Sequence, residues 1–203
     1  MITDVWKYRG KSRNESPRLR QQWQDVLEEC WQTEAGPEER LRIALLNVDY
    51  VTSFELPFRL LLTRTQQLIA ALREEWDISQ KNVVFNDKRF GCVYSLKASL
   101  SGVPDTYWYH LSHRICRVVG NENTSLPYQQ VAREVKAPRE RLKYALEAGL
   151  LVTALDGLFW FGSQRIAADV LRLRKAGMPV VTTTVEVHDN LTGTTRKVPA
   201  YHL

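Results

Sequence analysis

One segment near the carboxyl end of the chain carries residue types that read nucleic-acid bases. The sequence "SQRIAADVLRLRKAG", residues 163–177, predicts a helix with two unlike faces. Gln and Arg side chains can form two hydrogen bonds to one base edge, and a small Ala lets a helix approach the major groove closely. The residues expected on this face or at its start are Ser163, Gln164, Arg165, Ala168, Arg172 and Lys175.

The opposite face of the same predicted helix is apolar, with Ile166, Val170 and Leu173 at helical spacing. Ser163 is the expected N-cap and Gly177 the expected stop. No carboxylate stands four residues before or after Arg172 or Lys175. A cationic face without such partners suits phosphate better than the rim of a protein interface, so we expect this helix to bind double-stranded DNA.

Two neighbouring segments extend this surface. "PVVTTTVEVHD" and "TTRKVPAYHL" flank a turn at 190–193, which predicts a two-stranded hairpin, and a hairpin after a base-reading helix is a wing. The hairpin residues expected to reach phosphate or the minor groove are Thr194, Thr195, Arg196 and Lys197. The residues expected to extend the surface from a helix over 138–148 are Arg139, Arg141 and Lys143.

Metal and catalytic chemistry fit the sequence less well. His110, His113 and Cys116 follow one another at three-residue intervals, so the first and the third point away from each other on a helix. A zinc site there would need a further ligand, and Cys92 is the nearest candidate. No Gly-rich phosphate loop, nucleophile elbow or paired-carboxylate motif is present. We therefore predict no metal ion, no cofactor, no catalytic residue and no enzymatic activity.

Charge divides the chain into three parts. Residues 1–20, expected to be a basic and flexible arm, carry six Lys or Arg against two acidic residues. Residues 21–103 are expected to form a helical domain with a β-like excursion at 81–97. This part is acidic, whereas the 104–203 region is again basic. A basic segment on each side of an acidic middle suggests a polyanion partner, although solvated surfaces would give the same pattern.

Three helices are predicted in the first domain. Ser16 and Pro17 open one, Pro37 opens the second, and the third runs over 57–76. The third is apolar on most of its circumference, which indicates burial against a partner. We expect its 60–72 part to support a homodimer through residues 21–80, because a two-fold dimer matches a palindromic site. The apolar stripe predicted on the first helix is Leu19, Trp23, Val26, Leu27 and Trp31.

Three more helices are predicted over 107–119, 127–135 and 138–148. The last two are joined by a short turn and have helix-turn-helix spacing. Residues 150–161 have two interpretations. Thr153 and Asp156 stand at the spacing of a capping box, whereas Asp156-Gly157 is a strong hairpin signal. We favour the helix, because Phe161-Gly162-Ser163 then leads directly into the base-reading helix.

Composition places the chain among ordinary globular proteins, with 203 residues, 44% hydrophobic residues and 25% charged residues. No apolar run reaches the roughly 18 residues of a membrane span, and the basic N-terminus has no apolar core of a signal peptide. Three scattered cysteines fit a reducing compartment. We expect no membrane partner and a cytoplasmic, nucleoid-associated location in a bacterium.

The carboxyl-terminal segment also resembles a known family over residues 140–203, under a third of the chain. The residues that match are Thr153, Asp156, Leu158, Phe161, Gly162, Arg165, Ile166, Ala167, Leu173, Arg174, Gly177 and Tyr201. They are similar to the helix-turn-helix domain family common in phage and plasmid proteins. Gly157 departs from the pattern, where the family has a better helix former, and this predicts a short first helix. The resemblance implies a DNA-binding winged helix and no particular target.

We therefore predict a mainly α protein with a small β-wing. A helical N-terminal domain precedes a C-terminal region of tandem helix-turn-helix or winged-helix units. The expected function is sequence-specific binding of double-stranded DNA, as a transcriptional regulator of a phage or plasmid. Two alternatives stay open: a plasmid replication initiator, and a winged-helix subunit of a larger nucleoprotein complex. The sequence predicts neither a target site nor a small-molecule effector.

Overall fold

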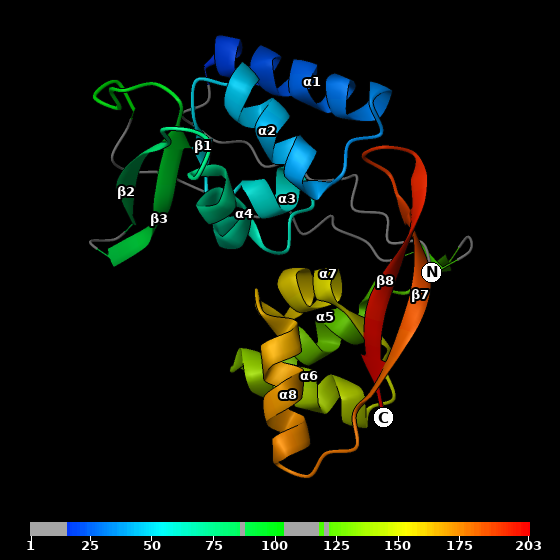
Figure 1. The fold of residues 1–203 in the computed structure, drawn as a ribbon. Coiled ribbons are helices and arrows are strands. Elements are labelled where there is room, and N and C mark those ends of the chain that lie inside the picture. Colours follow the sequence, from blue (N-terminus) through cyan, green and yellow to red (C-terminus); the bar gives the residue numbers. More distant parts are fainter. Residues whose placement is uncertain (1–15, 86–87, 104–117, 120–121) are drawn as a thin grey trace. The chain divides into compact units, whose positions relative to one another are not determined.

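The structure, a computed structural model, describes residues 16–85, 88–103, 118–119 and 122–203 (Figure 1). These residues form two compact units. The N-unit contains the described residues up to 103, together with the turn Leu191–Gly193. The C-unit contains the described residues from 118 to 190 and from 194 to 203. Helices dominate and the sheets are small, as predicted.

The N-unit begins with two helices that open as the sequence predicts. In α1 (Pro17–Gln32), the Ser16 hydroxyl accepts a hydrogen bond from the Leu19 amide at 3.1 Å, so Ser16 is the N-cap. In α2 (Pro37–Asn47), the first turn holds two glutamates. The face of α1 that packs against α2 differs in part from the predicted stripe, because Cys30 is buried whereas Trp31 is 53% exposed.

The predicted single helix over 57–76 is wrong, because the chain breaks in its middle. The structure has α3 (Leu56–Arg59) and α4 (Thr65–Leu72), separated by a non-helical segment. Leu61 in this segment has a φ of 54°, a left-handed conformation that interrupts a helix. Its neighbours Leu60 and Leu62 are 0% and 1% exposed, so the apolar residues that suggested a homodimer are buried within the N-unit itself.

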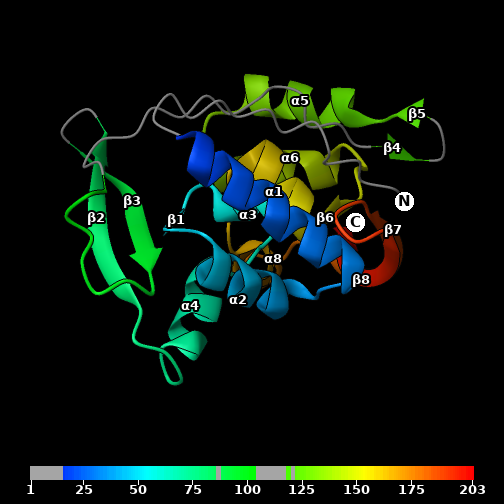
Figure 2. The ribbon, with the colours of Figure 1, turned by 90° about the horizontal axis from the view of Figure 1, so that it is seen from above.

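The predicted β-like excursion is a hairpin in a three-stranded antiparallel sheet. Its strands are β1 (Val51–Thr52), β2 (Ser79–Phe85) and β3 (Lys88–Ser95), in the order β1-β3-β2. Figure 2 shows the β2–β3 hairpin to one side of α1, α2 and α4. A bulge interrupts the β2–β3 register between Val83 and Val84. Gly91 lies where a Cβ atom would come within 2.5 Å of the Ser53 hydroxyl, so close packing explains this glycine.

Asp49 joins α1 to the sheet of the N-unit. Its carboxylate accepts a hydrogen bond from the Lys97 ammonium and lies 3.3 Å from the Arg18 guanidinium. Its backbone amide donates to Gln22, and its carbonyl accepts from the Ser95 hydroxyl. The hydrogen bond from Lys97 lowers the pKa of Asp49 below its usual value, and Gln22 and Arg18 act in the same direction.

A carboxylate with a lowered folded-state pKa stabilises the fold above its unfolded-state pKa, and the stabilisation disappears as the pH falls through the folded-state value. We expect Asp49→Asn to remove about 1 kcal/mol or less at neutral pH. The same substitution should flatten the loss of stability below about pH 4. Urea unfolding of both proteins between pH 2 and 7 measures this. Asp25→Asn, which removes an exposed carboxylate from α1, is the control and should keep the wild-type slope.

The C-unit combines helices with a second three-stranded sheet. The helices are α5 (Ser125–Glu134), α6 (Pro138–Glu147), α7 (Ala154–Asp156), the π-helical turn η1 (Gly157–Phe161) and α8 (Ile166–Lys175). The strands β6 (Val152–Thr153), β7 (Val181–Asp189) and β8 (Thr194–His202) pair antiparallel in the order β6-β8-β7. A small ladder joins β4 (Val118–Val119) to β5 (Glu122–Asn123). The prediction of a helix over 107–119 is therefore wrong at its last two residues, which form strand β4. Its other residues lie outside the described part of the chain.

One apolar core serves both helix pairs of the C-unit. Leu142 and Leu146 of α6 and Phe161 of η1 are fully buried at its centre, and Tyr128 of α5 stacks on Phe161 with 6.3 Å between ring centroids. The predicted apolar face of α8 joins the same cluster. The helices at 125–147 and at 154–175 therefore share their packing.

The helical interpretation of residues 150–161 is confirmed after the short strand β6. Thr153 and Asp156 form the predicted capping box, in which each side chain bonds the other residue's backbone amide. Gly162 ends η1 with a φ of 71°, in the left-handed region that favours glycine. A Cβ atom on Gly157 would come within 2.7 Å of Ile166, so this unexpected glycine permits η1 to pack closely against α8.

Candidate nucleic-acid interface

Helix α8 presents the predicted polar face to solvent. Ile166, Val170 and Leu173 are at most 7% exposed and fix the orientation of the helix. Arg165, Arg172 and Lys175 are exposed, and Ala168 is half-buried. In the order Arg165, Ala168, Arg172 and Lys175, these four residues are three, four and three positions apart, so they form one stripe along the helix. We call this set, together with the exposed Gln164 before the helix, the α8 stripe.

The start of α8 differs from the prediction. The helix begins at Ile166 with Arg165 at the N-cap, so the expectation that Ser163 caps it is wrong. Ser163 is 6% exposed, and its hydroxyl donates to the Asp169 carboxylate at 2.6 Å. Because this hydroxyl is engaged inside the C-unit, we leave Ser163 out of the proposed DNA surface.

Asp169 also contacts two of the predicted DNA-binding arginines. Its Oδ1 atom lies 3.5 Å from the Arg172 guanidinium and 4.0 Å from that of Arg139 on α6. The sequence argument that Arg172 has no acidic neighbour is therefore wrong, because it considered only a spacing of four residues. Asp169 is three residues away, which is also a neighbouring position on a helix. Within the described residues, no carboxylate pairs with Arg165 or Lys175.

The three basic residues predicted on α6 have different surroundings. Arg139 is exposed at the start of the helix, beside Asp169. Lys143 is exposed and lies 3.8 Å from Glu147, a surface ion pair that contributes little. Arg141 instead donates to the Val135 carbonyl at 2.6 Å and to the Phe161 carbonyl at 3.5 Å. It thereby satisfies carbonyls at the ends of α5 and η1, and we assign it a structural role.

The four hairpin residues predicted to contact DNA lie on opposite faces of β8. They all belong to the strand and not to the turn. Thr195 and Lys197 are exposed on one face, whereas Thr194 and Arg196 are half-buried on the other. Arg196 forms an ion pair with Asp189 of β7, whose side chain is 1% exposed. Only Thr195 and Lys197 therefore remain as candidate hairpin contacts.

Arg174 shows how the hairpin is attached to α8. Its guanidinium donates to the Val180 carbonyl at 2.8 Å and to the Thr182 hydroxyl of β7 at 2.7 Å. The last turn of α8 carries Arg172, Arg174 and Lys175, which are all exposed, and Arg174 also holds strand β7. Sequence reasoning missed one exposed apolar residue beside the stripe, Leu171, which is 52% exposed.

Among the described residues, no group of three or more His, Cys, Asp or Glu side chains could hold a metal ion. His110, His113 and Cys116 lie outside the described residues. Cys92 is buried in the N-unit, where its sulfur atom accepts a hydrogen bond from Gln80. The neighbouring aromatic residues Phe161 and Trp160 belong to the core of the C-unit, the first buried and the second half-buried.

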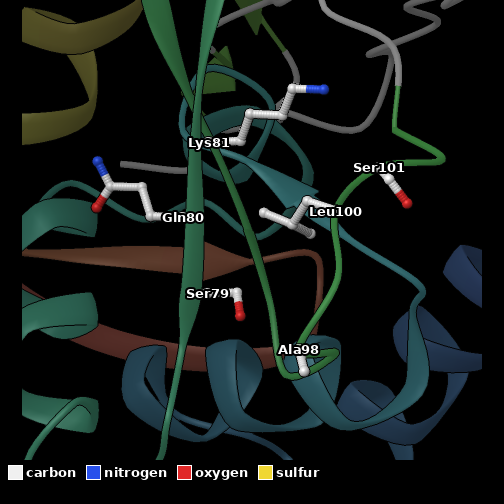
Figure 3. Close-up of a pocket in the computed structure, with 6 residues that line it drawn as sticks. All are labelled: Ser79, Gln80, Lys81, Ala98, Leu100 and Ser101. Atoms are coloured by element: carbon white, nitrogen blue, oxygen red, sulfur yellow. The ribbon is translucent and has the colours of Figure 1, made fainter.

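The N-unit has a depression between β2 and the segment that follows β3. It measures about 420 Å³. Its lining residues are Ser79, Gln80, Lys81, Ala98, Leu100 and Ser101. Figure 3 shows Gln80 and Lys81 extending from opposite sides of β2. The Lys81 ammonium donates to the Val103 carbonyl at 2.9 Å, and Gln80 accepts from Arg73. These polar groups bond to their neighbours and do not converge on one point, so the depression has no catalytic geometry.

Comparisons of the chain with protein-family models, with curated proteins and with solved structures found no match. No helix among the described residues is long and apolar enough to cross a bilayer.

Proposed function

We propose that the C-unit binds double-stranded DNA in a sequence-specific way and that α8 is its base-reading helix. The observation that carries this proposal is the α8 stripe. Arg172 is exposed on the side of α8 opposite its packed apolar face, and Gln164 and Arg165 are exposed directly before the helix. Their side chains are the types that bond guanine and adenine edges in the major groove, and half-buried Ala168 leaves room for close approach.

The order of elements around α8 supports a winged-helix arrangement. Helices α6, α7 and α8 and the β7–β8 hairpin follow one another in this order (Figure 1). Strand β6 lies between α6 and α7 in the sequence, and β8 is the central strand of the sheet. In DNA-binding domains of this design, a helix enters the major groove and the hairpin contacts the backbone. Lys175, Lys197 and Arg139 would then hold phosphates on either side of the bases that α8 reads.

We propose further that the protein regulates transcription, in line with the resemblance of residues 140–203 to phage and plasmid DNA-binding domains. Selection of bound duplexes from a random DNA pool tests the DNA-binding proposal. We expect a defined motif to be enriched by the full chain. A palindrome would fit a regulator that binds as a dimer, whereas direct repeats would favour a replication initiator. An unchanged pool after several rounds at moderate salt would contradict the proposal.

A further inference from the structure

The C-unit holds a carboxylate in the middle of its cationic surface. Asp169 lies in the first turn of α8, and its side chain is 16% exposed, whereas those of Arg139 and Arg172 are 59% and 60% exposed. The carboxylate thus lies below the level of the guanidinium groups. A negative charge so close to bound DNA would repel the phosphates and weaken binding, so the carboxylate must have another role.

The two oxygens of this carboxylate contact different parts of the unit. Oδ2 accepts the Ser163 hydroxyl hydrogen at 2.6 Å, which ties the carboxylate to the turn that precedes α8. Oδ1 faces Arg172, one turn along α8, and Arg139, at the start of α6. Because Ser163 is buried, the carboxylate has a fixed position from which it can orient both arginines.

We propose that Asp169 is the positioning residue that gives Arg172 its base specificity, an inference that rests on the proposed DNA-binding function. One nitrogen of the Arg172 guanidinium, Nη1, lies 3.5 Å from Asp169 Oδ1, so the side chain loses rotamer freedom before DNA arrives and keeps its other N–H groups for a base. The carboxylate also lowers the attraction of the surface for DNA in general. Both effects raise the ratio of specific to non-specific affinity.

Asp169→Asn in the full chain tests the proposal. Asparagine keeps the shape and can still accept the Ser163 hydrogen bond, so the fold should be retained, which thermal unfolding checks. We measure the affinity for the selected duplex and for a scrambled duplex at the same salt concentration. We expect tighter binding to the scrambled duplex, weaker binding to the selected one, and a specificity ratio reduced by about tenfold, the scale of one oriented base contact.

Glu134→Gln is the matched control, because it removes one carboxylate of the same unit on α5, where the glutamate bonds Gln130 and Tyr144. This variant should leave the specificity ratio unchanged. Ser163→Ala is the second test variant, since it releases the carboxylate without changing the charge, and it should lower the ratio in the same direction as Asp169→Asn.

The outcomes separate the two proposals. If the wild-type chain enriches no duplex, DNA binding itself is overturned, and this inference with it. If the wild-type chain enriches a motif but Asp169→Asn changes both affinities by one common factor, Asp169 contributes charge alone. DNA binding then stands, and only the positioning role is overturned. An unaltered ratio in Ser163→Ala, with a folded protein, would also count against the positioning role.

Discussion

Replacing Arg40 with alanine should lower the free energy of unfolding by about 4 kcal/mol, from the loss of buried hydrogen bonds and the cavity left behind. Arg40 lies on α2 and is 0% exposed. Its guanidinium donates to the Ala35 carbonyl at 2.8 Å and to the Leu60 carbonyl at 3.2 Å. The second carbonyl precedes left-handed Leu61, so this arginine fixes the break between α3 and α4.

Arg42→Ala is the matched control for this prediction. Arg42 is two residues further along α2, and it pairs with Glu38 and Glu75 and covers the Trp76 ring at the surface. The Arg42 side chain is 22% exposed and both of its glutamate partners are more than half exposed, so this variant should lose less stability than Arg40→Ala and unfold at a urea concentration closer to that of the wild type. Equal losses in the two variants would show that Arg40 contributes no more than Arg42, whose partners are exposed.

The sequence predicted several helix boundaries correctly where local signals act, although Ser163 does not cap α8. Ser16, Pro17 and Pro37 open helices as expected, and Gly162 ends one. These signals work because a cap or a proline acts on the backbone within one turn. The capping box predicted at Thr153 and Asp156 forms for the same reason, since both of its hydrogen bonds are local.

The hydrophobic periodicity of residues 57–76 predicted one helix, and this was wrong because the break is stabilised by a residue far away in the sequence. Three consecutive leucines there fit a helix that is buried all round, and the pattern cannot show that Leu61 adopts a left-handed conformation. The Leu60 carbonyl at the break is bonded by Arg40, twenty residues earlier in the chain. A dimer interface was thus inferred from residues that serve the core of their own unit.

The candidate DNA surface was predicted in its centre and less well at its margins. Helical spacing correctly predicted that Arg172 and Lys175 lie on an exposed face of α8, and the binding of DNA by this face stays a prediction. At its margins, the prediction assumed that every charged side chain is exposed to DNA. Arg141 instead bonds backbone carbonyls, and Arg196 pairs with a buried aspartate. Asp169 was missed as a partner of Arg172 because only a spacing of four residues was considered.

Removing both arginines of the α8 stripe, Arg165 and Arg172, by substitution with alanine should weaken binding to the selected duplex by about 100-fold, because one base-directed arginine is worth about 1–3 kcal/mol. The slope of affinity against salt concentration should also become shallower, since two cations fewer displace counterions. Neither side chain belongs to the core of the C-unit, so the thermal midpoint should change little.

The control for this double variant removes two positive charges from the N-unit instead of from α8. Arg20 and Arg64 are exposed on the N-unit, and replacing both with alanine lowers the net charge of the chain by the same two positive charges. Fluorescence anisotropy with the selected and the scrambled duplex compares the two double variants. If charge alone drives binding, both variants lose affinity equally for both duplexes. If α8 reads bases, only the variant without Arg165 and Arg172 loses its preference for the selected duplex.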